Sequence, residues 1–117
     1  MKYELLVGDP WDFEALDGKN KILVDGLGIV DVIDSNGQSK ELYLLQVLHP
    51  FMMDKQKVDF LVFQPRHVGD TIYEIAQAGG VVGVYRVKEG LLTQKEQQIS
   101  VNDLSYCIIG NLNVLSA

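Results

Sequence analysis

The chain is a succession of short β-favouring segments separated by turn signals, and this pattern limits the folds that it can adopt. Extended segments are expected near residues 3–7, 22–33, 41–48, 58–64, 81–88 and 105–114. The connections leave no room for the crossover helices that parallel strands need. We therefore predict a mainly β protein, with α+β as the alternative. Its form is a small antiparallel β-barrel or half-barrel of six or seven strands with one or two short helices.

Glycines mark the first long hairpin. The pair Asn36-Gly37 lies between the segments 22–33 and 41–48, and such a pair supplies the positive φ angles of a two-residue hairpin turn. Gly26 and Gly28 interrupt the first of these segments, which predicts a β-bulge or a sharp bend there.

The segment 41–48 is apolar on both of its faces. Leu42, Leu44 and Leu48 alternate with Tyr43, Leu45 and Val47, so this strand is expected in a central position or in a closed barrel. Pro50 is expected to end it, and Pro65 to end the segment 58–64.

Two segments are ambiguous between helix and strand. For residues 70–79 a short helix is favoured, with Asp70 as N-cap and Gly79 after the last turn, although a strand is the alternative. For residues 100–115 the start resembles a capping box, Ser100 to Asp103, and a helix of that length would carry an apolar stripe. We predict a turn at 100–104 followed by a strand over 105–114, because residues 106–109 favour β structure.

The length of 117 residues predicts a single domain over 1–117, and the net charge of −6 restricts its partners. Residues 1–34 hold eight acidic and three basic side chains, whereas residues 35–117 hold eight acidic and seven basic ones. Nucleic-acid binding needs clustered Lys and Arg, which this chain lacks, so we expect no nucleic-acid partner. A basic protein is a possible partner, although the charge can equally serve solubility.

The cellular setting follows from cysteine use and from hydropathy. The one cysteine, Cys107, excludes an internal disulfide framework, which fits the reducing cytoplasm, and its apolar context indicates packing rather than nucleophilic chemistry. No apolar run reaches the length of a membrane span, so no membrane partner is expected.

No cofactor motif is complete. Gly26-x-Gly28 begins like a dinucleotide fingerprint, but Asp31 occupies the position of the third glycine and a strand follows instead of a helix. The acidic residues of 12–17 do not have calcium-loop spacing. His49 and His67 follow strands that would place them about 20 Å apart. We predict no metal ion, no cofactor and no catalytic residue, and acid–base catalysis by Asp12, Glu14 or the pair His67 and Asp70 is a less favoured alternative.

Two sets of residues are candidates for binding. A small ligand in the mouth of the barrel would contact polar groups of the second half of the chain, namely Arg66, His67, Tyr73, Tyr85 and Arg86. Apolar residues in expected loops would form a protein interface, namely Trp11, Phe13, Phe51, Met52 and Met53. We favour a non-catalytic binding or oligomerisation domain that forms a homodimer through such a loop or through an edge strand, and the ligand-binding barrel is the alternative.

Overall fold

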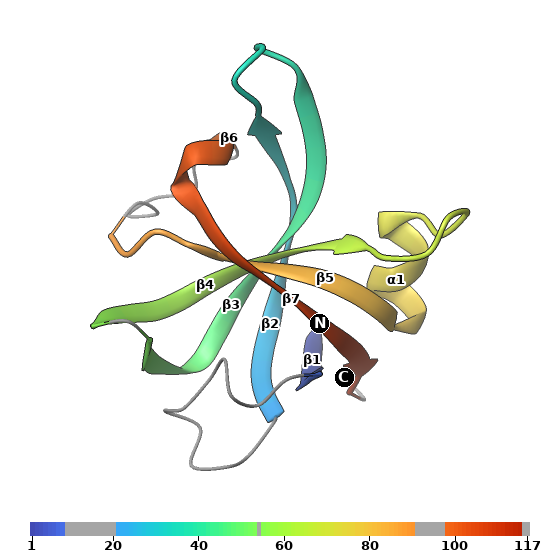
Figure 1. The fold of residues 1–117 in the computed structure, drawn as a ribbon. Helices are drawn as coiled ribbons and strands as arrows, with labels where there is room; N and C mark the ends of the chain where they lie inside the picture. Colours follow the sequence, from blue (N-terminus) through green and yellow to red (C-terminus); the bar gives the residue numbers. More distant parts are fainter. Residues whose placement is uncertain (9–20, 54, 91–97, 116–117) are drawn as a thin grey trace.

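The computed structural model describes residues 1–8, 21–53, 55–90 and 98–115. Its regular elements are seven strands, one short α-helix and one 3-10 turn (Figure 1). In chain order they are β1 (Lys2–Val7), β2 (Lys21–Ile33), β3 (Ser39–Met53), β4 (Gln56–Pro65), α1 (Ile72–Ala78), β5 (Gly80–Val87), β6 (Gln98–Ser100), η2 (Val101–Asp103) and β7 (Leu104–Val114).

Six of the strands close into an antiparallel barrel. The sheet runs in the order β1-β7-β5-β4-β3-β2, and a further pairing between β1 and β2 joins its two ends. The seventh strand, β6, adds in parallel to the last three residues of β2. The predicted mainly β fold and its antiparallel barrel are confirmed, and the barrel is closed rather than half open.

Large apolar side chains fill the barrel. Tyr3, Leu45, Leu61, Phe63 and Leu112 are almost completely buried and belong to one hydrophobic cluster with residues from every barrel strand and from α1. Among the described residues no polar or charged residue is buried. A barrel of eight strands is just wide enough for side chains to fill, so the side chains of this cluster pack the narrower interior of a barrel of six strands.

The predicted β-bulge of β2 is confirmed and changes which residues face inward. The pairing with β3 shifts between Gly26 and Gly28, so that Leu27 is an extra residue. Before the bulge, Val24 faces the barrel interior; after it, Val30 faces outward. Gly26 is required because a Cβ there would lie 2.7 Å from Cε2 of Tyr3.

A second hydrophobic cluster lies on the outside of the barrel wall. Its buried members are Val30, Val32, Leu42, Val62, Val87 and Ile99, which come from β2 to β6. Leu42 and Leu45 belong to different clusters, as do Val62 and Phe63, so β3 and β4 are apolar on both faces. This arrangement confirms the two-sided character predicted for residues 41–48.

The hairpin loop between β2 and β3 is longer than predicted. The N–H of Asp34 donates to the Gln38 carbonyl at 2.8 Å, and the N–H of Gly37 donates to the Asp34 carbonyl at 3.0 Å. Among residues 34–38 only Gly37 has a positive φ, of 80°. The prediction of a two-residue turn is therefore wrong, because the loop has three residues. Asp34 Oδ1 stabilises this loop by accepting hydrogen bonds from the backbone N–H groups of Asn36 and Gln38.

The segment 51–53 is not the exposed loop that the sequence predicted. β3 continues past Pro50 to Met53, with an irregular pairing to β4 between Gln46 and Phe51. Phe51 and Met53 are buried in the barrel cluster, and only Met52, 53% exposed, faces outward. The interface prediction is therefore wrong for Phe51 and Met53. Proline is tolerated at this break because its missing N–H interrupts no regular ladder there.

The helix predicted within 70–79 is confirmed and covers one end of the barrel. Its N-cap is Thr71 rather than Asp70, since the Thr71 hydroxyl accepts from the N–H of Glu74. Ile72 and Ile75 extend into the barrel cluster. Gly79 follows the last turn with a φ of 79°, and a Cβ there would meet the Leu112 carbonyl oxygen at 2.3 Å.

The end of the chain also follows its prediction. The capping box of Ser100 and Asp103 is present and starts η2, and the last strand begins at Leu104. The N–H of Lys88 donates to the Asp103 carbonyl at 2.8 Å, which ties this turn to the end of β5.

Candidate binding surfaces

The five predicted ligand-binding residues do not share one site. Arg66 and His67 are exposed in the turn between β4 and α1. Arg86 pairs with Leu61 in the middle of β4. Five residues of extended chain separate these positions, or about 17 Å. The mouth of the barrel thus gathers no polar site from these residues.

Arg86 forms hydrogen bonds to two other strands near the β3–β4 hairpin. Its Nη1 donates to the Met53 carbonyl at 3.0 Å, and its Nε donates to Ser105 Oγ at 3.0 Å. A guanidinium group is well suited to this role because its donors form a rigid fork. The side chain therefore joins the β3–β4 hairpin to β7.

Tyr73 is exposed on the first turn of α1. Its hydroxyl donates to Glu41 Oε2 at 3.2 Å, which links the helix to β3. The nearby Glu41 carboxylate raises the pKa of Tyr73, since it disfavours a second negative charge. The contact connects two elements on the surface and forms no cavity.

The pair His67 and Asp70 gives no support to acid–base catalysis. The hydrogen bond that joins the two residues runs between the N–H of Asp70 and the His67 carbonyl, at 3.3 Å, and so involves backbone groups. Both residues are exposed. General-base action requires an imidazole that a partner orients within a cleft. Asp12 and Glu14 lie outside the described residues, as do Trp11 and Phe13 from the interface prediction.

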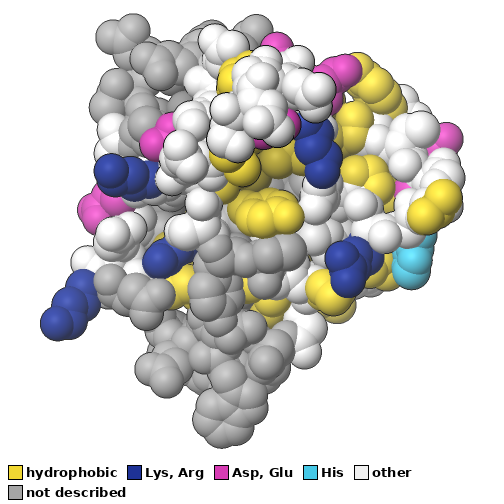
Figure 2. Space-filling view, turned by 45° about the horizontal axis from the view of Figure 1, so that its top comes forward, with side chains coloured by type: hydrophobic (Ala, Val, Ile, Leu, Met, Phe, Trp, Pro, Cys, Tyr) yellow, Lys and Arg dark blue, Asp and Glu magenta, His cyan; other side chains and the backbone are white. Residues whose placement is uncertain are grey.

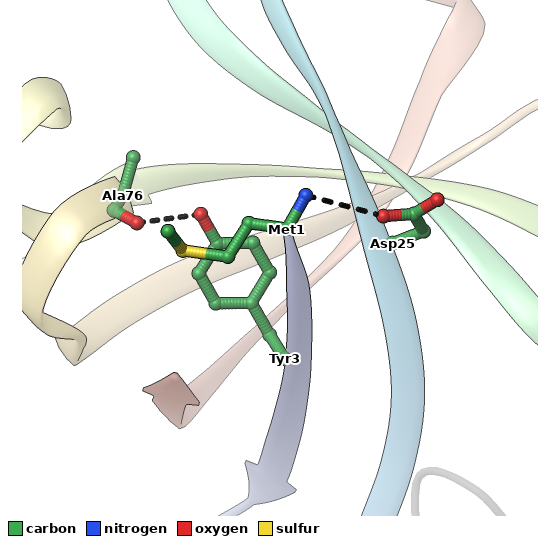
Figure 3. Close-up of polar contacts among 4 residues, drawn as sticks. All are labelled: Met1, Tyr3, Asp25 and Ala76. Atoms are coloured by element: carbon green, nitrogen blue, oxygen red, sulfur yellow. Dashed lines mark hydrogen bonds and ion pairs between the residues drawn. The ribbon is translucent and has the colours of Figure 1, made fainter. Parts of the chain in front are cut away.

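Tyr3 and the N-terminus each make a polar contact that joins two elements of the fold. The Tyr3 hydroxyl donates to the Ala76 carbonyl at 2.5 Å, and the N-terminal ammonium lies 3.5 Å from Asp25 Oδ1 (Figure 3). Burial raises the pKa of Tyr3 well above its ordinary value, and Tyr43 and the charge of Asp25 add to the shift. The Tyr3 hydroxyl therefore stays neutral and joins α1 to the barrel. A neutral phenol of this kind serves as a hydrogen-bond donor and not as a base.

An apolar hollow lies over the second hydrophobic cluster. Four half-buried side chains, here called its rim residues, pack against this cluster, which contains the fully buried Val62: Leu44, Phe60, Tyr85 and Leu104. In the view that brings β6 and the β2–β3 hairpin forward, hydrophobic side chains lie in a hollow with Lys and Arg nearby (Figure 2). We call this site, defined by its four rim residues, the outer hollow.

Polar groups follow one edge of the outer hollow. Gln64 Nε2 donates to the Tyr85 hydroxyl at 3.1 Å, and Lys40 Nζ donates to Gln64 Oε1. Of the ligand-binding residues predicted from the sequence, Tyr85 is therefore the one that reaches this site. The sequence analysis did not select four other residues of this site: Lys40, Leu44, Phe60 and Gln64. The apolar alternation of residues 42 and 44 was the signal in the sequence that pointed to this face of the sheet.

A second apolar surface covers the outside of β2 and β3. Leu23 is 37% exposed, Leu27 49% and Leu48 37%. Leu23 and Leu48 each adjoin the pair Val24 and Val47, at which the antiparallel register of β2 and β3 begins, and Leu27 occupies the bulge further along β2. We call these three residues the leucine face. It was missed because a strand segment does not show by itself which of its two faces remains uncovered.

The charged side chains around the leucine face balance one another, and the N-terminal ammonium lies beside Asp25, although the protein as a whole is acidic. The charged side chains that alternate outward with it on β1 and β2 are Lys2, Glu4, Lys21 and Asp25, two of each sign. Opposite charges lie on neighbouring strands, since Lys2 pairs with Asp25. An apolar face without an excess of acidic groups, on a chain of net charge −6, meets less repulsion in self-contact than an acidic surface would.

Three further findings concern metal ligands, membrane-spanning helices and similar proteins. Among the described residues, no group of three or more His, Cys, Asp or Glu side chains is arranged to hold a metal ion. The one described α-helix falls far short of the length and hydropathy needed to cross a bilayer. None of the protein-family models, curated proteins or solved structures compared with the chain matches it. Function is therefore argued from the two surfaces.

Proposed function

We propose that the protein is a non-catalytic, self-associating binding module whose homodimer contact is the leucine face. The single observation that carries this proposal is the cluster of Leu23, Leu27 and Leu48, each more than a third exposed, on a wall where polar residues are expected in a monomer. The proposal moves the expected contact from residues 51–53 to the outer side of β2 and β3.

A two-fold dimer fits the geometry of this face. In an isologous contact the same patch meets itself, so its apolar centre covers its own copy. The balanced charges of Lys2, Glu4, Lys21 and Asp25 can then pair across the two-fold axis. Antiparallel walls of this kind pack face to face at about 10 Å, which suits leucine side chains.

The cellular setting proposed for this module is the reducing cytoplasm. The single cysteine supports it, because a chain with one cysteine uses no internal disulfide. The alternative to self-association is binding of a basic protein to the acidic part of the surface. The net charge of −6 supports this alternative.

Sedimentation equilibrium over low to high micromolar concentration tests the dimer. We expect the wild-type protein to dimerise and the double variant Leu23→Gln, Leu48→Gln to weaken the dimer at least about tenfold, since each replacement buries a polar amide. Met52→Gln is the matched control, because Met52 is an apolar side chain that is more exposed than Leu23 and Leu48 but lies at the β3–β4 hairpin.

Circular dichroism shows whether the variants are folded, and Leu27→Lys in the bulge is a second disruption that needs no change in a paired strand position. A wild-type protein that sediments as a monomer at every concentration contradicts the proposal. So does a dimer that the Leu23 and Leu48 replacements leave intact.

A further inference from the structure

The loop of the β2–β3 hairpin, which projects beyond the barrel at the top of Figure 1, carries an asparagine directly before a glycine. Asn36 and Gly37 are both exposed, and a Cβ built on Gly37 would meet no atom within 4 Å beyond its chain neighbours. The φ of Gly37 is 80°, a value that favours glycine over any residue with a side chain. The Asn36 carboxamide is therefore followed by a backbone amide that no side chain shields.

This pair of residues has the groups for a reaction between side chain and main chain. The Gly37 nitrogen attacks Cγ of Asn36, so that an N–Cγ bond forms and the Cγ–Nδ2 bond breaks. The side-chain nitrogen leaves as ammonia and takes up the proton that the Gly37 nitrogen gives up. Water then opens the succinimide ring. Cleavage at Cγ gives aspartate, whereas cleavage at the main-chain carbonyl carbon gives isoaspartate, in which the main chain is longer by one carbon atom.

Hydrogen bonds within the closed loop oppose this reaction. The Gly37 N–H donates to the Asp34 carbonyl at 3.0 Å, so the attacking nitrogen is engaged. Asp34 Oδ1 also accepts the N–H groups of Asn36 and Gln38, each at 2.9 Å, and so holds the main chain on both sides of Gly37. Ring closure therefore requires local opening of the loop, and the bonds of Asp34 determine how often it opens.

The other described asparagines lack this combination. Asn111 and Asn113 lie in β7, each before a large aliphatic residue, and both pair with β1. Their side-chain amides are joined to each other by a hydrogen bond of 3.2 Å. Asn102 lies in η2 before Asp103, and its N–H donates to Ser100 Oγ. Among the described residues, an unshielded amide thus follows an asparagine at the hairpin loop alone.

We propose that Asn36 is a modification site, at which the folded protein converts spontaneously and selectively to isoaspartate and aspartate, at a rate that Asp34 controls. Either product adds a negative charge that repels the neighbouring Asp34 carboxylate. Isoaspartate in addition lengthens the loop, while the paired strands below it keep their register. The site involves neither the leucine face nor the outer hollow, so it does not depend on dimerisation.

Peptide mapping of the folded protein after prolonged incubation at neutral pH tests the proposal. A lysine-specific protease, used at mildly acidic pH to prevent conversion during digestion, releases residues 22–40, in which Asn36 is the one asparagine. Mass spectrometry measures the acid in this fragment, and an isoaspartyl methyltransferase with labelled S-adenosylmethionine measures the isoaspartate. We expect conversion in this fragment well before any in residues 96–117, which hold Asn102, Asn111 and Asn113.

Asp34→Ala tests the control of the rate. We expect this variant to convert about tenfold faster, a factor that corresponds to about 1.4 kcal/mol, because the loop loses two hydrogen bonds to a charged acceptor. Asp31→Ala is the matched control, since Asp31 is an exposed acid on β2 of the same hairpin, and its rate should equal that of the wild type. Asn36→Ser should abolish conversion in the fragment 22–40.

Circular dichroism shows whether the variants are folded. Conversion of the wild type that is no faster in residues 22–40 than in residues 96–117 overturns the proposal. A folded Asp34→Ala variant that converts at the wild-type rate, or an equal acceleration by Asp31→Ala, overturns it as well. If Asp34→Ala does not fold, a peptide of residues 31–41 supplies the open loop. Equal rates in this peptide and in the folded wild type would then contradict control by the loop.

Discussion

Tyr3 connects the barrel wall, its interior and its helix through one side chain. Its ring packs edge-on against Tyr43, with centroids 6.4 Å apart, and lies over Gly26, whose missing side chain leaves the space. Its hydroxyl reaches the Ala76 carbonyl at the end of α1. A residue this deeply buried contributes both packing and a hydrogen bond that water cannot replace.

Replacing Tyr3 with Phe keeps the ring and removes this hydrogen bond. We expect the free energy of unfolding to fall by about 1–2 kcal/mol, because the Ala76 carbonyl loses its donor in a partly buried place. Chemical denaturation measures the change. Tyr73→Phe is the control, since the Tyr73 hydroxyl contacts Glu41 at an exposed site, and its effect should be much smaller.

The same pair of variants tests the pH dependence. The pKa of Tyr3 is raised in the folded protein, chiefly by burial, so the unfolded chain loses this proton first, at about pH 10. The stabilisation is therefore complete below pH 10 and declines as the pH rises from there toward the folded pKa. A stability curve of Tyr3→Phe that declines as steeply as wild type above pH 10 would contradict this account.

At the scale of elements, bulges and turns determine which face of a strand is covered. The bulge at Gly26–Gly28 turns Val30 and Val32 outward, and without it β2 would place them on the barrel side. The irregular pairing near Pro50 leaves the alternation of β3 unchanged, since Phe51 and Met53 share a face and the barrel cluster with Leu45 and Val47. In the leucine face, Leu27 owes its outward position to the bulge, whereas Leu23 lies in the regular part of β2 before it.

The β3–β4 turn contains a strained residue. Lys55 has a φ of 64°, the one positive value among the described residues other than glycine. A side chain in this left-handed region is unfavourable, so Lys55→Gly should raise the free energy of unfolding by about 1 kcal/mol. In contrast, Lys57→Gly, in the paired strand, should lower it by about 0.5–1 kcal/mol. Denaturant midpoints of the two variants that move in the same direction would refute the assignment of strain to the turn.

At the scale of the whole molecule, the two hydrophobic clusters share their walls. Leu42 and Leu45 on β3, and Val62 and Phe63 on β4, send adjacent side chains to opposite clusters. If β3 or β4 unfolded, side chains of both clusters would become exposed to water. We therefore expect one cooperative unfolding transition for the described body of the protein.

Ile99→Ala tests this coupling from the outer cluster. Ile99 is 2% exposed and comes from β6, outside the closed barrel, and its truncation should cost about 2–5 kcal/mol. Circular dichroism and tyrosine fluorescence should report the same shifted midpoint, measured at one protein concentration. Val101→Ala, at an exposed position, should change stability by less than about 0.5 kcal/mol. Two separate transitions in the Ile99 variant would show that the clusters unfold independently.

Local chemistry made several parts of this structure predictable from residues that are close in the chain. The hairpin at Gly37, the bulge at Gly28, the helix ending at Gly79 and the capping box at Ser100 each depend on φ angles or hydrogen bonds within a few residues. The two-sided apolar pattern of residues 41–48 likewise predicted a strand inside a closed sheet.

Tertiary pairing decided what neighbours alone cannot show. Phe51 and Met53 look like loop residues until β4 pairs beside them, and Leu23 looks like a core residue until the barrel closes with that face outside. The sequence thus determined where the strands lie and how they turn. The closure of β1 on β2, which depends on contacts distant in the chain, decided which apolar side chains are covered and which remain available for binding.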